Sequence, residues 1–112
     1  MMASYRALVS RCEVVSAGDA GYPACLGRLP AGERPARLFV AGAIPPSPGM
    51  AIVGTRAPDA HGLLLTDRLA RECASRGIPV ISGGASGIDS EAHRSCLDAG
   101  GTTVVVLAGG LE

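Results

Sequence analysis

The sequence predicts an α/β fold: a partial, three-layer Rossmann-like parallel sheet of the βαβαβ type, preceded by a loop-rich lead-in. After residue 49, short apolar runs alternate with segments of helical length, which is typical of parallel strands joined by helices. Before residue 50, glycine and proline are frequent and indicate loops. A chain of 112 residues leaves little room for a second full domain. We therefore expect residues 1–49 to form the lead-in with one short strand, and residues 50–112 to form the partial Rossmann-like domain.

The lead-in contains only one segment with a clear strand pattern, Arg37 to Ala41. Tyr5 to Val15 is compatible with a short helix or with an irregular lead-in. The segment Pro45-Pro46-Ser47-Pro48-Gly49 can form neither a helix nor an interior strand. It is therefore the clearest boundary in the chain.

The first βα unit follows this boundary. Met50 to Val53 is an apolar run that ends at Gly54, and Asp59 is a suitable N-cap for the helix after it. Gly77 is placed to end that helix. The apolar positions of the helix repeat every four residues and predict an apolar face: Leu65, Leu69 and Cys73, flanked by Ala70 and Ala74.

The second unit repeats the pattern. Ile78 to Ser82 is an apolar run, Ile88 to Ala99 is a helical segment, and Thr102 to Ala108 is a β-branched run. Asp67 and Arg71, on the first helix, are an i, i+4 pair in the favourable order. The crossovers between the strands should be right-handed.

Composition excludes several classes of function. Ten basic and ten acidic residues give a net charge of zero, so no global field draws the chain to nucleic acid or to a membrane. Aromatic residues are only 3%, which argues against rows of stacking platforms for single strands. All basic residues are arginine, which excludes lysine-dependent phosphate loops and Schiff-base chemistry.

The cysteines and the hydropathy pattern bear on metals and on location. Cys12, Cys25, Cys73 and Cys96 form no C-x-x-C pair, so we expect no metal site. Scattered thiols without a signal peptide fit a reducing cytoplasm. No apolar run reaches the roughly 20 residues that span a bilayer, and we expect no membrane partner.

Ligands of parallel α/β sheets bind beyond the carboxyl ends of the strands. Three glycine-rich loops lie at such positions: Gly54-Thr55-Arg56, Gly83 to Asp89, and Gly109-Gly110-Leu111. Loops that lead into helix N-termini favour anions, so we expect a phosphate-binding rim. The middle loop is not a G-x-G-x-x-G fingerprint, and we predict no cofactor.

Individual residues in these loops allow two interpretations each. Arg56 could hold a phosphate bidentately, or it could pair with a nearby carboxylate or remain solvated. Ser86 and Asp89 match a capping box for the second helix, which is the favoured structural interpretation. Ser82 could donate to a phosphate, although serine is common at strand ends. His93 shares a helix face with Asp89 but lacks a third partner, so we expect no catalytic residue.

Four motifs in order resemble the DNA-processing protein A family (DprA, also called Smf). The similarity covers about residues 18–112. The matching segments are Tyr22-Pro23 to Gly42, Ala51-Ile52-Val53-Gly54-Thr55-Arg56 with Pro58, Ser82-Gly83-Gly84-Ala85-Ser86-Gly87-Ile88-Asp89 with Ala92-His93, and Ala99 to Leu107 with Gly110-Leu111-Glu112.

The resemblance implies a Rossmann-like core that binds single-stranded DNA, acts in natural transformation, and helps to load the recombinase RecA without being an enzyme. It implies that Arg56 contacts a DNA phosphate and that backbone N–H groups of Gly83 to Gly87 contact another. The candidate DNA- or phosphate-binding residues share these loops: Gly54, Thr55, Arg56, Ser82, Gly83, Gly84, Ser86, Gly87 and Asp89.

Two departures from the family pattern carry expectations of their own. The family usually has a basic residue where this chain has Ser86, so we expect weaker affinity and a salt slope reduced by about one unit. The sequence also stops after the third strand, and we expect a fragment, a degenerate gene product or a homo-oligomer that covers the sheet edge. The alternative is a nucleotide-phosphate-binding module without DNA activity.

Overall fold

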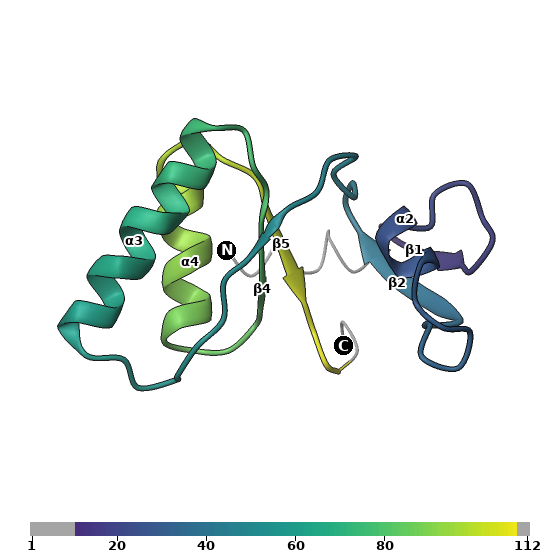
Figure 1. Cartoon of the computed structure of the whole chain (residues 1–112), viewed down its shortest axis with the longest axis horizontal. Coiled ribbons are helices and arrows are strands. Elements are labelled where there is room, and N and C mark those ends of the chain that lie inside the picture. Colours follow the sequence, from purple (N-terminus) through teal and green to yellow (C-terminus); the bar gives the residue numbers. More distant parts are fainter. Residues whose placement is uncertain (1–10, 110–112) are drawn as a thin grey trace. The chain divides into compact units, whose positions relative to one another are not determined.

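The computed structural model describes residues 11–109, and the chain forms two compact units that divide between Pro46 and Ser47. Figure 1 shows the ribbon of both units, coloured along the sequence. The division falls within the proline-rich segment, whose residues have no regular secondary structure. Each unit is described by itself below.

The first unit is built on an antiparallel pair of strands. β1 (Cys12–Ser16) pairs with β2 (Arg37–Ala41), with Cys12 opposite Ala41 and Ser16 opposite Arg37. A single-turn helix, α2 (Ala24–Gly27), lies in the connection.

The expectation of one strand in the lead-in was therefore wrong, and so was the helix or irregular segment expected for residues 12–15. In the rest of that segment, residue 11 is part of a turn and residues 5–10 lie outside the described residues. Val14 and Val15 favour extended backbone, but a strand this short depends on its partner more than 20 residues away along the chain. Local patterning does not reveal such a partner.

The second unit contains the predicted βαβαβ sheet. Its elements in order are β3 (Met50–Ala51), α3 (Ala60–Ser75), β4 (Val80–Gly83), α4 (Ile88–Asp98) and β5 (Thr103–Val106). The strand order is β3-β4-β5, and both pairings are parallel. The α/β class and the parallel sheet are confirmed. The strands are shorter than the apolar runs that predicted them, although the amide of Ile52 still donates to the carbonyl of Ile81 over 3.0 Å.

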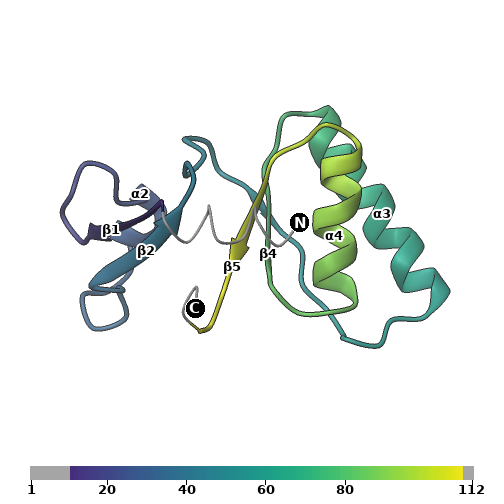
Figure 2. The same cartoon turned by 180° about the vertical axis from the view of Figure 1, so that it is seen from behind.

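Both helices of this unit cover the same face of the sheet, as Figures 1 and 2 show from opposite sides. Among the described residues of the unit, no helix covers the other face, so two of the three predicted layers are formed. Sequential parallel strands with crossovers of one hand place their helices on one side, which explains the arrangement. The core lies between the sheet and the helices: Ile52, Ala70, Cys73, Val80, Ile88, Ala92 and Cys96.

The packed face of α3 differs from the predicted one. Thr66, Ala70 and Cys73 are buried, whereas Leu65 and Leu69 are about half exposed. Small side chains dominate the core shared by α3 and α4, since Ala70 and Ala92 are both fully buried. The prediction was therefore correct for Cys73 and the flanking Ala70, whereas the burial expected of Leu65 and Leu69 was wrong.

The predicted ends of α3 are confirmed. Asp59 is the N-cap, and its carboxylate accepts a hydrogen bond of 2.7 Å from the amide of Gly62. Gly77 follows the helix with φ of 67°, and the amide of Ile78 returns to the carbonyl of Cys73 over 2.9 Å. These caps fix the length of α3 and hence where β4 begins.

Candidate functional site

The parallel sheet directs the carboxyl ends of its strands to one edge of the second unit. The loop after β3 contains Gly54, Thr55 and Arg56, and the loop after β4 runs from Gly84 to Gly87. The loop after β5 contributes residues 107–109, while Gly110 and Leu111 lie outside the described residues. The structure thus brings parts of the three predicted loops to one edge.

The first two loops interlock through glycines. The amide of Ile88 donates to the carbonyl of Thr55 over 3.1 Å. Gly87 has φ of 84°, and a Cβ there would collide with the backbone of Thr55 and Arg56. A Cβ on Gly54 would lie 2.8 Å from Cγ1 of Ile88. The close contacts fix the backbone of Arg56 next to the start of α4.

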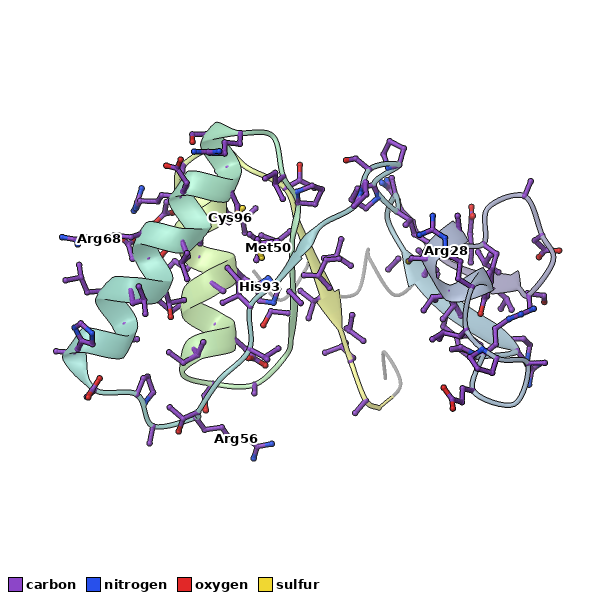
Figure 3. All side chains as sticks on the ribbon, viewed as in Figure 1. Arg28, Met50, Arg56, Arg68, His93 and Cys96 are labelled. Atoms are coloured by element: carbon purple, nitrogen blue, oxygen red, sulfur yellow. The ribbon has the colours of Figure 1, made fainter. Side chains whose placement is uncertain are left out.

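Arg56 is exposed, and its side chain extends away from the loop in Figure 3. Within residues 11–109 it forms no ion pair, in contrast to Arg71, Arg76 and Arg94. No carboxylate within residues 11–109 therefore pairs with Arg56. A solvated guanidinium next to a helix N-terminus can bind an anion without first breaking another contact.

Arg56 also lines a cavity of about 410 Å³ at this edge. A Cβ on Gly84 would lie 2.5 Å from Cδ2 of Leu107, so the loop after β4 passes close to that side chain. The lining residues are Arg56, Gly83, Gly84, Ala85, Asp89, Val106, Leu107, Ala108 and Gly109. Sequence analysis missed the wall formed by Val106 and Leu107, because these residues were assigned only to a strand.

The predicted capping box at the start of α4 was wrong. The N-cap is Gly87 rather than Ser86, and no side chain caps the helix. The left-handed backbone of Gly87 turns the chain just before the helix, and Ser86 is exposed. The hydroxyl of Ser90, not that of Ser86, bonds within the loop, donating to the carbonyl of Ala85 over 2.7 Å. The N-terminus of α4 thus keeps backbone N–H groups that no side chain satisfies.

Ser82 is placed differently from the other candidates. Its side chain is 2% exposed, and its hydroxyl donates to the carbonyl of Ile52 over 2.5 Å. This bond links β4 to the residue that follows β3. The hydroxyl has a structural partner already, so the phosphate contact expected of Ser82 has no support in this geometry.

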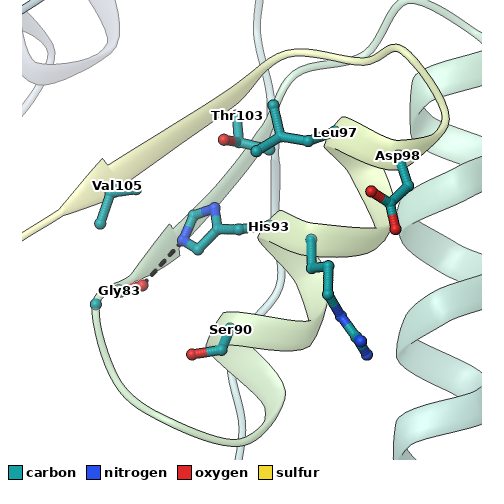
Figure 4. Close-up of a pocket in the computed structure, with 9 residues that line it drawn as sticks. Gly83, Ser90, His93, Leu97, Asp98, Thr103 and Val105 are labelled. Carbon is teal, nitrogen blue, oxygen red and sulfur yellow. Dashed lines mark hydrogen bonds between the residues drawn. The ribbon is translucent and has the colours of Figure 1, made fainter. Parts of the chain in front are cut away.

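Asp89 and His93 both lie beside Gly83. Asp89 is 7% exposed, and a Cβ on Gly83 would lie 2.6 Å from its Oδ2. The Nε2 of His93 donates to the carbonyl of Gly83 over 2.9 Å, as Figure 4 shows. Asp89 Oδ1 and His93 Nδ1 are both buried without a hydrogen-bond partner. Sequence analysis placed both residues on one helix face but did not foresee the burial of the carboxylate.

A second hollow of about 500 Å³ lies along α4 and β5. Figure 4 shows His93, Leu97 and Val105 around it. Leu97 and Val105 are 58% and 49% exposed, so this surface is largely apolar. Within the described residues, no group of three potential metal-ligating side chains occurs. No helix in the described part of the chain is both long and apolar enough to cross a membrane.

The fold and this edge define a Rossmann-like α/β unit with an arginine and an uncapped helix N-terminus at the strand ends. Residues 13–112 match the family model described as DNA recombination-mediator protein A. The chain belongs to this family, which confirms the resemblance noted from the motifs.

Relatives with known names agree with this assignment. A DprA-type protein of Mycobacterium tuberculosis strain H37Rv is 53% identical over 62 residues, covering 55% of this chain and 16% of that protein. The DNA processing protein DprA of Bacillus subtilis is 43% identical over 61 residues, covering 54% of this chain and 20% of that protein. The matched segments therefore span a fifth or less of these relatives.

A solved structure resembles the chain over most of its length. The X-ray structure of DNA processing protein A from Streptococcus pneumoniae covers 98% of this chain and 38% of that chain. The TM-score is 0.74 and the sequence identity is 25%. The α/β arrangement derived above is therefore that of a solved family member.

Proposed function

We propose that the chain binds single-stranded DNA through its phosphates, at the edge formed by Arg56 and the N-terminus of α4. The observation that carries the proposal is the exposed guanidinium of Arg56, which has no ion-pair partner within residues 11–109 and is held beside an uncapped helix start. A cation and free backbone N–H groups at one place are suited to a phosphodiester. The names of the relatives, which refer to DNA processing, support the choice of ligand.

The residues of this edge contribute to phosphate binding in different ways. Arg56 supplies the charge, Gly83 to Gly87 supply backbone N–H groups, and Gly54 and Gly87 allow the two loops to approach closely. Thr55 supports its loop, because its Oγ1 accepts from the amide of Ala57 over 3.1 Å. Ser86 is exposed but uncharged, so we expect weak binding with few phosphate contacts. The role is binding without catalysis.

We place this binding within the wider role that the family resemblance implies. That role is the handling of single strands in the cytoplasm during natural transformation and their transfer to the recombinase RecA. The matched relatives are much longer than the segment they share with this chain. RecA loading is thus proposed for a protein that contains this unit, and DNA binding for the unit itself.

We also propose that β5 mediates association between copies of the chain. β5 pairs with β4 on one side only among the described strands, and Val105 and Val106 are 49% and 60% exposed. An unpaired apolar edge favours pairing with a further strand. Sedimentation at micromolar protein should show dimers or larger species, whereas a single monomeric species would contradict this proposal.

The alternative function is binding of a free nucleotide phosphate at the same edge. A cavity of about 410 Å³ lies within the usual size of small-ligand sites. A thermal-shift comparison separates the two functions. An oligonucleotide of about 20 nucleotides that raises the melting temperature, when mononucleotides at equal phosphate concentration do not, supports DNA binding. The opposite result supports the nucleotide module.

A further inference from the structure

The antiparallel pair of β1 and β2, in the first unit, has two unlike faces. Paired residues point to the same side of a sheet, and side chains alternate along each strand. Val15, Leu38 and Val40 therefore share one face, and each of them is partly buried. Val14 lies opposite Phe39 on the other face, and these two side chains are 53% and 64% exposed. The single phenylalanine of the chain is thus exposed on a sheet face.

The face that contains Phe39 carries a cation and no carboxylate. Its six positions on the two paired strands are Cys12, Val14, Ser16, Arg37, Phe39 and Ala41. Arg37 is exposed, and within residues 11–109 it forms no ion pair. The other arginines of the first unit's described part share this property, in contrast to three arginines of the second unit: Arg11, Arg28 and Arg34. The face is therefore suited to an anionic partner that also has a flat apolar part.

The structural role of the other described aromatic residue sets Phe39 apart. Tyr22 is partly buried, and its hydroxyl donates to the carbonyl of Pro35 over 2.7 Å, which ties two segments of the first unit together. The ring of Phe39 packs against no comparable partner and is largely open to solvent. A low aromatic content excludes a row of stacking platforms, but one exposed ring is enough to stack one base.

We propose that this face is a second contact for single-stranded DNA, with one base stacked on the ring of Phe39 and a neighbouring phosphate at the guanidinium of Arg37. The inference rests on the single-stranded DNA binding proposed above, but it adds a contact in the first unit. Stacking tolerates any base, because every base has a flat π face. Since both units belong to one chain, a strand held at Arg56 raises the local concentration of DNA at Phe39.

A fluorescent reporter at the platform tests the stacking directly. The chain contains no tryptophan, so Phe39→Trp introduces a single indole at this position. We expect an all-thymine strand of about 20 nucleotides to quench its fluorescence over the concentration range in which the strand binds. Leu65→Trp is the control, because Leu65 is 52% exposed on α3 in the second unit. A strand of the same length without bases carries the same phosphates and should quench neither variant.

Affinity measurements separate the ring from the charge. Phe39→Leu keeps an apolar side chain but removes the ring, so the thymine strand should bind about tenfold more weakly with an unchanged salt slope. Phe39→Tyr keeps the ring and should bind like the unaltered chain. Arg37→Gln should lower the salt slope by about one unit. A loss of binding that came only from a disturbed fold would not be restored by the ring of Phe39→Tyr.

The outcomes separate this contact from the one at Arg56. If a labelled strand binds but the fluorescence of Phe39→Trp stays constant, the inference is overturned and the proposed function stands. Equal affinity of Phe39→Leu and the unaltered chain, or equal quenching of Leu65→Trp, has the same meaning. Absence of binding to every strand overturns the proposed function, and with it this inference. If Phe39→Leu lowers the sedimenting mass of the chain and leaves DNA affinity intact, the face joins copies of the chain and the base contact is overturned.

Discussion

The carbonyl oxygen of Thr55 accepts a hydrogen bond from the backbone N–H of Ile88, with a length of 3.1 Å. This bond joins the loop after β3 to the first turn of α4. Gly87 packs against the same carbonyl, so no side chain separates the two segments. The backbone of Arg56 and the N-terminus of α4 are therefore held next to each other by direct backbone contacts.

Gly87→Ala should disrupt this arrangement. The new Cβ would collide with the backbone of Thr55 and Arg56, and φ of 84° is unfavourable for alanine. We expect a loss of about 2 kcal/mol in the free energy of unfolding, measured by chemical denaturation. Gly32→Ala is the control, because its Cβ would have no neighbour within 4 Å. Equal stability of Gly87→Ala and the unaltered chain would show that the loops are not locked together.

Ser86→Arg should strengthen binding of single-stranded DNA. Ser86 is exposed at the start of α4, and its side chain has no capping role that the change would remove. One added cation near the phosphate path should steepen the salt slope by about one unit. Fluorescence titration at several salt concentrations measures the slope. Ser47→Arg adds the same charge at an exposed position outside the site and should leave the slope nearly unchanged. A similar gain from both variants would argue against a specific site.

Asp67→Asn should alter the dependence of stability on pH. The hydroxyl of Ser95 and then the guanidinium of Arg71 donate to Asp67, each over 2.8 Å, and they lower its pKa below the ordinary value of 3.8. A pKa lowered by folding means that the carboxylate stabilises the fold above pH 3.8. This stabilisation is lost as the pH falls through the lowered pKa.

Thermal unfolding between pH 7 and pH 2 tests the role of Asp67. The unaltered chain should lose stability below pH 3.8, and Asp67→Asn should lose less over the same interval. Asp98→Asn, at the far end of α4, serves as the control. If the profiles of the unaltered chain and Asp67→Asn are parallel, the bond between α3 and α4 through Ser95 does not contribute to stability.

Features set by neighbouring residues in the chain could be predicted from the sequence. The N-cap at Asp59, the end of α3 at Gly77 and the pairing of Asp67 with Arg71 all depend on residues within one or two helical turns. The parallel pairing of the strands followed from the alternation of apolar runs and helical segments. For the same reason Arg56 could be placed at a strand end before any contact was known.

Features set by contacts between distant segments could not be predicted. β1 is a strand because it pairs with β2, and the packed face of α3 is selected by α4. At the site, the spacing of Ser86 and Asp89 satisfied a capping pattern, but Gly87 packs on the loop after β3 and becomes the N-cap instead. The burial of Asp89 against Gly83 arises from the same tertiary contact.

The most direct test of phosphate binding at Arg56 is a titration of a fluorescent single strand of about 20 nucleotides with the unaltered chain and with Arg56→Ala. The titrations are run at about 50 mM and 200 mM salt, with Arg68→Ala as an exposed arginine control on α3. We predict that Arg56→Ala binds roughly tenfold more weakly and has a salt slope lower by about one unit, while Arg68→Ala matches the unaltered chain. Equal affinity and equal slope for Arg56→Ala and the unaltered chain would contradict the assignment of the site.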